Sequence, residues 1–129
     1  MKKIFVLLVV AVLFGSCGLR RDVERLGSVI RSPYKGQVTI MEEGSVVPEG
    51  AERVASIFIG DNGGTVKCNE EYVISDLMKT AARYGANYVV LLNRESPSFW
   101  TTCHQVKALA YWVDPAKIEK KKEPDQTAK

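Results

Sequence analysis

Length, composition and charge place the chain in a broad class before any motif is considered. Its 129 residues are 46% apolar and 26% charged, which is the balance of an ordinary globular protein and enough for one small domain. The formal net charge of +3 includes Lys2 and Lys3 at the extreme N-terminus. Nucleic-acid binding needs a clustered excess of basic residues, and this small net charge gives no sign of one. No nucleic-acid partner is therefore expected.

The N-terminus predicts export. A positively charged start precedes an unbroken apolar run over residues 4–14, which is too short to span a bilayer comfortably as a helix. The small residues Gly15 and Ser16 follow, as a signal peptidase requires beside its cut, and Cys17 comes next. Residues 1–16 are therefore predicted to be a signal peptide. In the simplest alternative this is an ordinary signal peptide in which Cys17 has no role.

The order of these residues resembles the lipobox of bacterial lipoproteins, in which the cysteine thiol is diacylated and becomes the first residue of the mature chain. Phe14 stands where an aliphatic residue is usual, three before the cysteine, and Leu13 lies one place further back. The resemblance implies that lipid on Cys17 attaches the protein to a membrane. Gly18, rather than aspartate, follows the cysteine, and by the sorting rule of enteric bacteria this favours the outer membrane.

Residues 17–36 are polar and mixed in charge, and we expect a lipidated tether there with at most one helical turn. A globular domain is expected over residues 37–113. Its first predicted strand covers residues 38–41 and its second residues 53–59, separated by glycine- and proline-containing turns. Both faces of the second strand are fairly apolar, so we expect it to lie centrally.

The clearest predicted element is a helix over residues 69–84. Asn69 is a suitable N-cap, and Gly85 suits the left-handed residue that follows a helix. Residues 87–93 then predict a strand buried on both faces. The apolar stripe of the helix has the spacing i, i+3, i+4, i+7 and comprises Ile74, Leu77, Met78 and Ala81.

The end of the chain predicts a loop, a strand and a tail. A loop over residues 94–102 contains Phe99 and Trp100, which either cap the core or mark a partner-binding surface. A strand follows over residues 105–113. Residues 114–129 are rich in lysine, glutamate and proline, and we expect them to be a disordered polar tail.

Three segments carry a resemblance to a known superfamily: PEGAERV at residues 48–54, AARYGANYVV at 81–90 and VKALAYW at 106–112. They resemble the superfamily of the Rcs stress-sensor outer-membrane lipoprotein and the YbjQ-like domains, which are labelled putatively heavy-metal-binding. The resemblance implies an α+β fold, in which one main helix packs across a small, mostly antiparallel sheet of about four strands. The element order deduced from the residues agrees with that fold.

Cys68 and Cys103 form an even pair once Cys17 is taken by lipid, and in an oxidising compartment such a pair most often forms a disulfide. Two alternatives stay open. A thiol enzyme would pair Cys103 with His104, although neighbours on an extended chain point to opposite sides. A metal site would use these three side chains, although structural zinc needs four ligands. Members of the superfamily carry disulfides near both cysteine positions, but the stress sensor has four such cysteines and this chain has two.

The sequence therefore predicts a non-catalytic, lipid-anchored envelope protein without a cofactor, whose domain acts in protein interaction or sensing. The alternatives are a metal- or small-ligand-binding envelope protein and an accessory subunit of an envelope complex. Residues 61–64 could be taken for a phosphate loop, but they lack the spacing of a P-loop and are interpreted as a turn.

Overall fold

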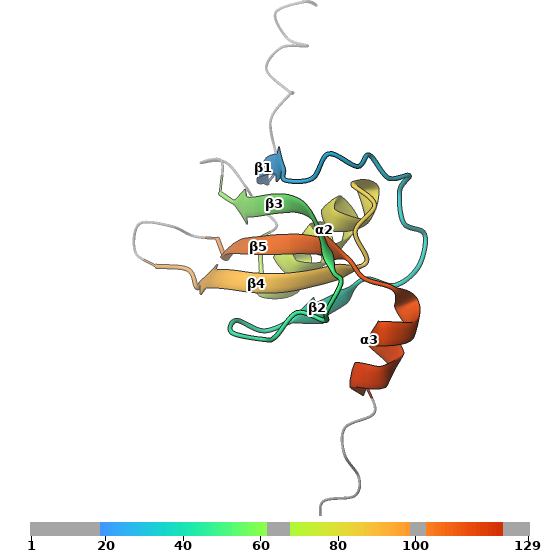
Figure 1. Ribbon diagram of the computed structural model, residues 1–129. Coiled ribbons are helices and arrows are strands. Elements are labelled where there is room, and N and C mark those ends of the chain that lie inside the picture. The colour runs from blue at the N-terminus through green and yellow to red at the C-terminus, as the bar shows by residue number, and fades with distance from the viewer. Residues whose placement is uncertain (1–18, 62–67, 99–102, 123–129) are drawn as a thin grey trace, which may run out of the picture.

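The computed structural model describes residues 19–61, 68–98 and 103–122, and it shows one sheet with a helix on one face (Figure 1). In chain order the elements are β1 (Arg20–Arg25), β2 (Thr39–Met41), β3 (Glu52–Gly60), α2 (Glu70–Arg83), β4 (Tyr88–Glu95), β5 (Gln105–Trp112) and α3 (Pro115–Lys122). The strand order is β1-β3-β5-β4-β2. The β2–β4 pair is parallel and the other three pairs are antiparallel.

The predicted α+β class is confirmed, but the sheet is mixed and has five strands where about four were expected. The additional strand is β1, so the expected tether over residues 17–36 is wrong for Arg20–Arg25. Leu19 is buried in the core and Val23 packs against it, while the charged side chains between them stay exposed. A strand this charged lacks the alternation of a buried strand, because it lies at the edge of the sheet.

An ion pair between Arg21 and Asp76 links β1 to helix α2. The Arg21 guanidinium donates two hydrogen bonds to the Asp76 carboxylate, at 2.6 Å from Nε and 2.8 Å from Nη2. The hydrogen bond to Asp76 raises the pKa of Arg21 above its ordinary value, so this arginine is charged at neutral pH. This pair joins two elements that are 55 residues apart in the chain.

The disordered tail expected over residues 114–129 is also wrong over α3. Asp114 caps this helix: its Oδ1 accepts from the Ala116 N–H at 3.0 Å, and its carbonyl oxygen accepts from the Lys117 N–H at 2.9 Å. Ile118 packs against a small apolar cluster that includes Tyr111. The Lys117 Nζ also donates to the Glu49 carbonyl oxygen at 2.7 Å. A cap and two tertiary contacts thus accompany a short helix in a segment that composition alone assigns to a tail.

Helix α2 has the predicted ends. The Asn69 side chain accepts a hydrogen bond from the Tyr72 N–H at 2.9 Å. Gly85 has φ +84°, and the Ala86 N–H bonds to the Ala81 carbonyl oxygen at 3.0 Å, which closes a Schellman motif. A Cβ at position 85 would also lie 2.5 Å from the Cβ of Arg31, in the segment that connects β1 to β2. Glycine is therefore needed there for both conformation and space.

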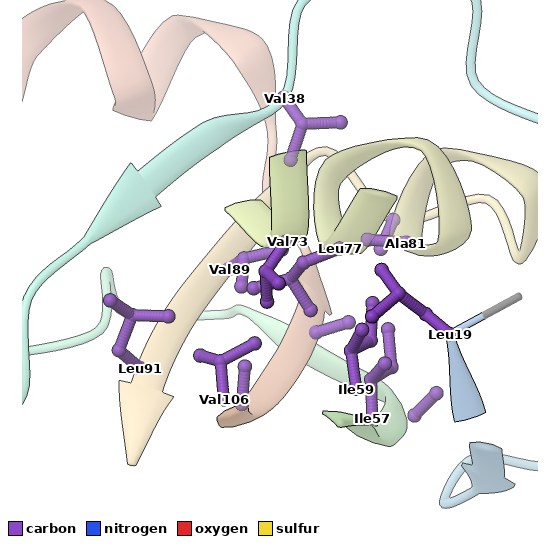
Figure 2. Close-up of a cluster of buried hydrophobic side chains, with 14 of the residues drawn as sticks. Leu19, Val38, Ile57, Ile59, Val73, Leu77, Ala81, Val89, Leu91 and Val106 are labelled. Atoms are coloured by element: carbon purple, nitrogen blue, oxygen red, sulfur yellow. The ribbon is translucent and has the colours of Figure 1, made fainter. Parts of the chain in front are cut away.

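The core lies between α2 and the inner face of the sheet (Figure 2). The side chains of Val73, Leu77 and Ala81 point from the helix toward Ile57 and Val89 on the strands. The predicted stripe is therefore right at Leu77 and Ala81, whereas Ile74 and Met78 are only half-buried beside the core. The buried face of the helix is rotated toward Val73, which is not part of the predicted stripe.

A buried asparagine ties three strands together directly after the helix. The Asn87 side chain donates to the Val113 carbonyl oxygen at 2.7 Å and accepts from the Val113 N–H at 2.8 Å. Its backbone N–H bonds to the Tyr111 carbonyl oxygen, and its own carbonyl oxygen accepts from the Thr39 N–H at 2.9 Å. Asn87 is fully buried, and these four hydrogen bonds satisfy it.

We predict that replacing Leu77 by alanine lowers the free energy of unfolding by about 2–5 kcal/mol, because the side chain is 0% exposed and the substitution leaves a cavity. The matched control is Lys79→Ala on the exposed side of the same helix, which should change it by no more than about 0.5 kcal/mol. Urea denaturation measures both. Equal and small effects would show that Leu77 does not face the core.

Candidate functional site

A groove of about 940 Å³ lies between α2 and β2, and we call it the α2–β2 groove. It exists because the helix is narrower than the sheet. Helix α2 packs against β3, β5 and β4 but does not cover the edge strand β2. The gap between the helix and that edge is therefore left open to solvent.

Apolar side chains form the inner wall of the groove. Ile40 comes from β2, and Ile74 and Met78 come from the helix. All three are half-buried and pack on the edge of the core. Ile40 faces the groove because the side chains of a strand alternate, so its neighbours Thr39 and Met41 lie on the other face of the sheet.

Arg94 forms ion pairs with Glu70 and Glu42 at the groove, and we call these three residues the Arg94 clasp. Arg94 lies near the end of β4; its Nη1 donates to Glu70 Oε1 at 2.7 Å, and its Nη2 to Glu42 Oε1 at 3.0 Å. The clasp thus links the start of the helix to the residue after β2. The Arg94 side chain is 38% exposed, and ion pairs this exposed contribute about 0–1 kcal/mol, so the clasp adds little to the stability of the fold.

His104 lines the groove and directly follows Cys103 of the disulfide in the chain. Its backbone N–H donates to the Cys68 carbonyl oxygen at 3.1 Å. Its ring lines the groove, and its Nδ1 atom is buried with no hydrogen-bond partner among the described residues. A buried nitrogen without a partner is uncommon in folded proteins.

The predicted disulfide is present. Cys68 and Cys103 are bonded, with their Cα atoms 5.0 Å apart, and the bond joins the residue before the helix N-cap to the segment before β5. Both sulfurs are therefore used, which removes the thiol that a Cys103–His104 enzyme needs and two of the three ligands considered for a metal. Within residues 19–61, 68–98 and 103–122, no three His, Cys, Asp or Glu side chains group as metal ligands do.

Several residues predicted to be functional lie outside the described residues: Cys17 with the rest of the signal region, and the aromatic pair Phe99 and Trp100. In the part of the chain that the structure describes, no helix is long and apolar enough to cross a membrane. No family model, curated protein or solved structure matches the chain.

The groove is not predictable from the sequence, although one signal of it is present. Ile74 and Met78 belong to the regular apolar stripe and were assigned to the core. A stripe of this kind shows that a helix face is apolar, but the width of the sheet beneath decides which residues it covers. Residues 42 and 94 are too far apart in the chain for the sequence to predict that they meet.

We predict that replacing both Cys68 and Cys103 by serine lowers the free energy of unfolding by roughly 3–4 kcal/mol. The reason is the chain entropy restored to the unfolded state, because the bond joins residues 35 positions apart. Urea denaturation measures it, and adding reductant to the wild-type protein should shift its curve in the same direction. Superimposable curves for the wild type, with and without reductant, and for the double variant would contradict a stabilising bridge.

Proposed function

We propose that the protein is a lipid-anchored bacterial envelope lipoprotein, held in the outer membrane through Cys17, whose folded domain binds another envelope protein without catalysing a reaction. The observation that carries the binding role is the α2–β2 groove, with its apolar wall and charged rim. Protein-binding surfaces have this arrangement, with an apolar centre inside a polar border.

The start of the fold supports close attachment to the membrane. Leu19 is 6% exposed and belongs to the core, and it follows Cys17 by only two residues. Two residues span at most about 7 Å, so lipid on Cys17 would hold the domain directly at the bilayer surface. The domain would then meet partners that are embedded in the same membrane or lie on it.

The resemblance to the stress-sensor superfamily is part of this proposal. The resemblance implies the order strand, strand, helix, strand, strand, and β2, β3, α2, β4 and β5 follow one another in that order, with β1 before them and α3 after them. A sensing role would follow if the occupancy of the groove changes with the state of the envelope. The disulfide leaves the metal-binding alternative with fewer ligands, so we place it second.

The lipid anchor is tested by labelling cells with radioactive palmitate. We expect label in the wild-type protein, and we expect Cys17→Ser to lose both the label and the membrane fraction. Several acyl chains, each contributing about 0.8 kcal/mol per buried CH₂, give a stable anchor that a single chain does not. Label that persists in Cys17→Ser would show that the lipid is attached to another residue, and it would contradict the anchor at Cys17.

The binding role is tested by photo-crosslinking in living cells. A photoreactive residue at Ser75, in the groove, should yield one dominant crosslinked protein. The matched control is Lys107, which is exposed on the opposite face of the sheet and should not yield that product. The same product from both positions, or none from Ser75, would remove the groove as the binding surface.

A further inference from the structure

The two edges of the sheet differ in a way that points to one of them as a binding edge. Five of the six residues of β1 are charged, an arrangement that discourages pairing with another chain. At the opposite edge, β2 reads Thr-Ile-Met, with no charge and no proline. Among the described residues, no strand pairs with the outer side of β2.

The backbone of Ile40 is directed toward that open side. The Thr39 N–H donates to the Asn87 carbonyl oxygen, so the backbone groups of Thr39 face β4. Backbone groups alternate along a strand in a parallel ladder, so those of Met41 face β4 as well and those of Ile40 face away. The edge therefore offers one N–H and one C=O to an incoming strand, and the Ile40 side chain is on the groove side.

The helix side of the groove supplies charge at two points. Glu71 and Lys79 both line the groove and are exposed, and neither forms an ion pair within the described residues. They are eight residues apart, which is about 12 Å along a helix. That distance equals about four residues of an extended strand, and residues i and i+4 of a strand lie on the same face.

We propose that the edge of β2 binds an extended segment of a partner protein as a sixth strand. The segment has the pattern basic, any, apolar, any, acidic, read in one direction or the other along β2. Its basic side chain lies opposite Glu71, its apolar side chain packs on Ile74 and Met78, and its acidic side chain lies opposite Lys79. Main-chain hydrogen bonds to Ile40 supply affinity, and the groove supplies specificity. The identification of the partner as an envelope protein rests on the proposed function, but the binding mode does not.

The test selects binders from a displayed library of random twelve-residue peptides on the purified full-length protein in detergent. We expect enriched peptides to alternate in period two and to share the charged and apolar pattern. The best peptide, synthesised with a fluorophore, should bind Ile40→Pro roughly tenfold more weakly than wild type, because proline removes the outward N–H. The matched control, Lys107→Ala, changes an exposed residue on the opposite face of the sheet and should bind as wild type does.

A second variant tests the charge pattern without touching the sheet. Selection on Glu71→Lys should enrich peptides in which the basic residue is replaced by an acidic one. No enrichment, enrichment with a helical period, equal binding to Ile40→Pro, or an unchanged charge pattern on Glu71→Lys would each overturn the proposal. Because the selection needs no lipid and no cellular partner, its failure is distinct from a failure of the palmitate or crosslinking experiments.

Discussion

The arrangement of the domain depends on the buried amide of Asn87. Its side chain holds the backbone of Val113, where β5 has just ended, and its backbone joins β5 on one side and β2 on the other. Asn87 lies two residues after Gly85, so the turn that ends the helix leads directly into this junction. An amide has donors and acceptors enough for both backbone groups of one residue, which no aliphatic side chain could satisfy. The residue whose side chain holds Val113 therefore also accepts, through its backbone carbonyl oxygen, the hydrogen bond of Thr39 at the start of β2.

The groove is a consequence of covering a five-stranded sheet with a single helix. Helix α2 buries Val73, Leu77 and Ala81 over the inner strands, and no second helix in the described part of the chain lies on that face beside β2. Arg94 joins both sides of the gap through its ion pairs with Glu70 and Glu42. This face of the sheet is covered by the helix over its inner strands and is open to solvent beside β2. It is therefore suited to a partner that covers the open part.

Local signals in the sequence predicted much of the fold. The N-cap Asn69, the terminating Gly85 and the apolar strands around the helix act over a few residues, and all appear as expected. The disulfide followed from counting cysteines. The errors came from two segments that tertiary contacts order. Strand β1 is charged and is stabilised by backbone pairing and the Arg21–Asp76 pair. Helix α3 has a cap at Asp114, a packing contact of Ile118 and a hydrogen bond from Lys117 to Glu49. The groove could not be predicted, because it depends on where residues far apart in the chain meet.

Native-state hydrogen exchange on Asn87→Ala tests most directly whether the Asn87 amide couples the end of β5 to the edge strand β2. We expect the substitution to lower the free energy of unfolding by about 2–4 kcal/mol, because it leaves the buried backbone groups of Val113 unpaired. Beyond that global loss, the β2 amides of Thr39 and Met41 should lose protection more than those of α2. An unfolding free energy that falls by less than about 1 kcal/mol, with β2 amides as protected relative to the helix as in the wild type, would contradict the account.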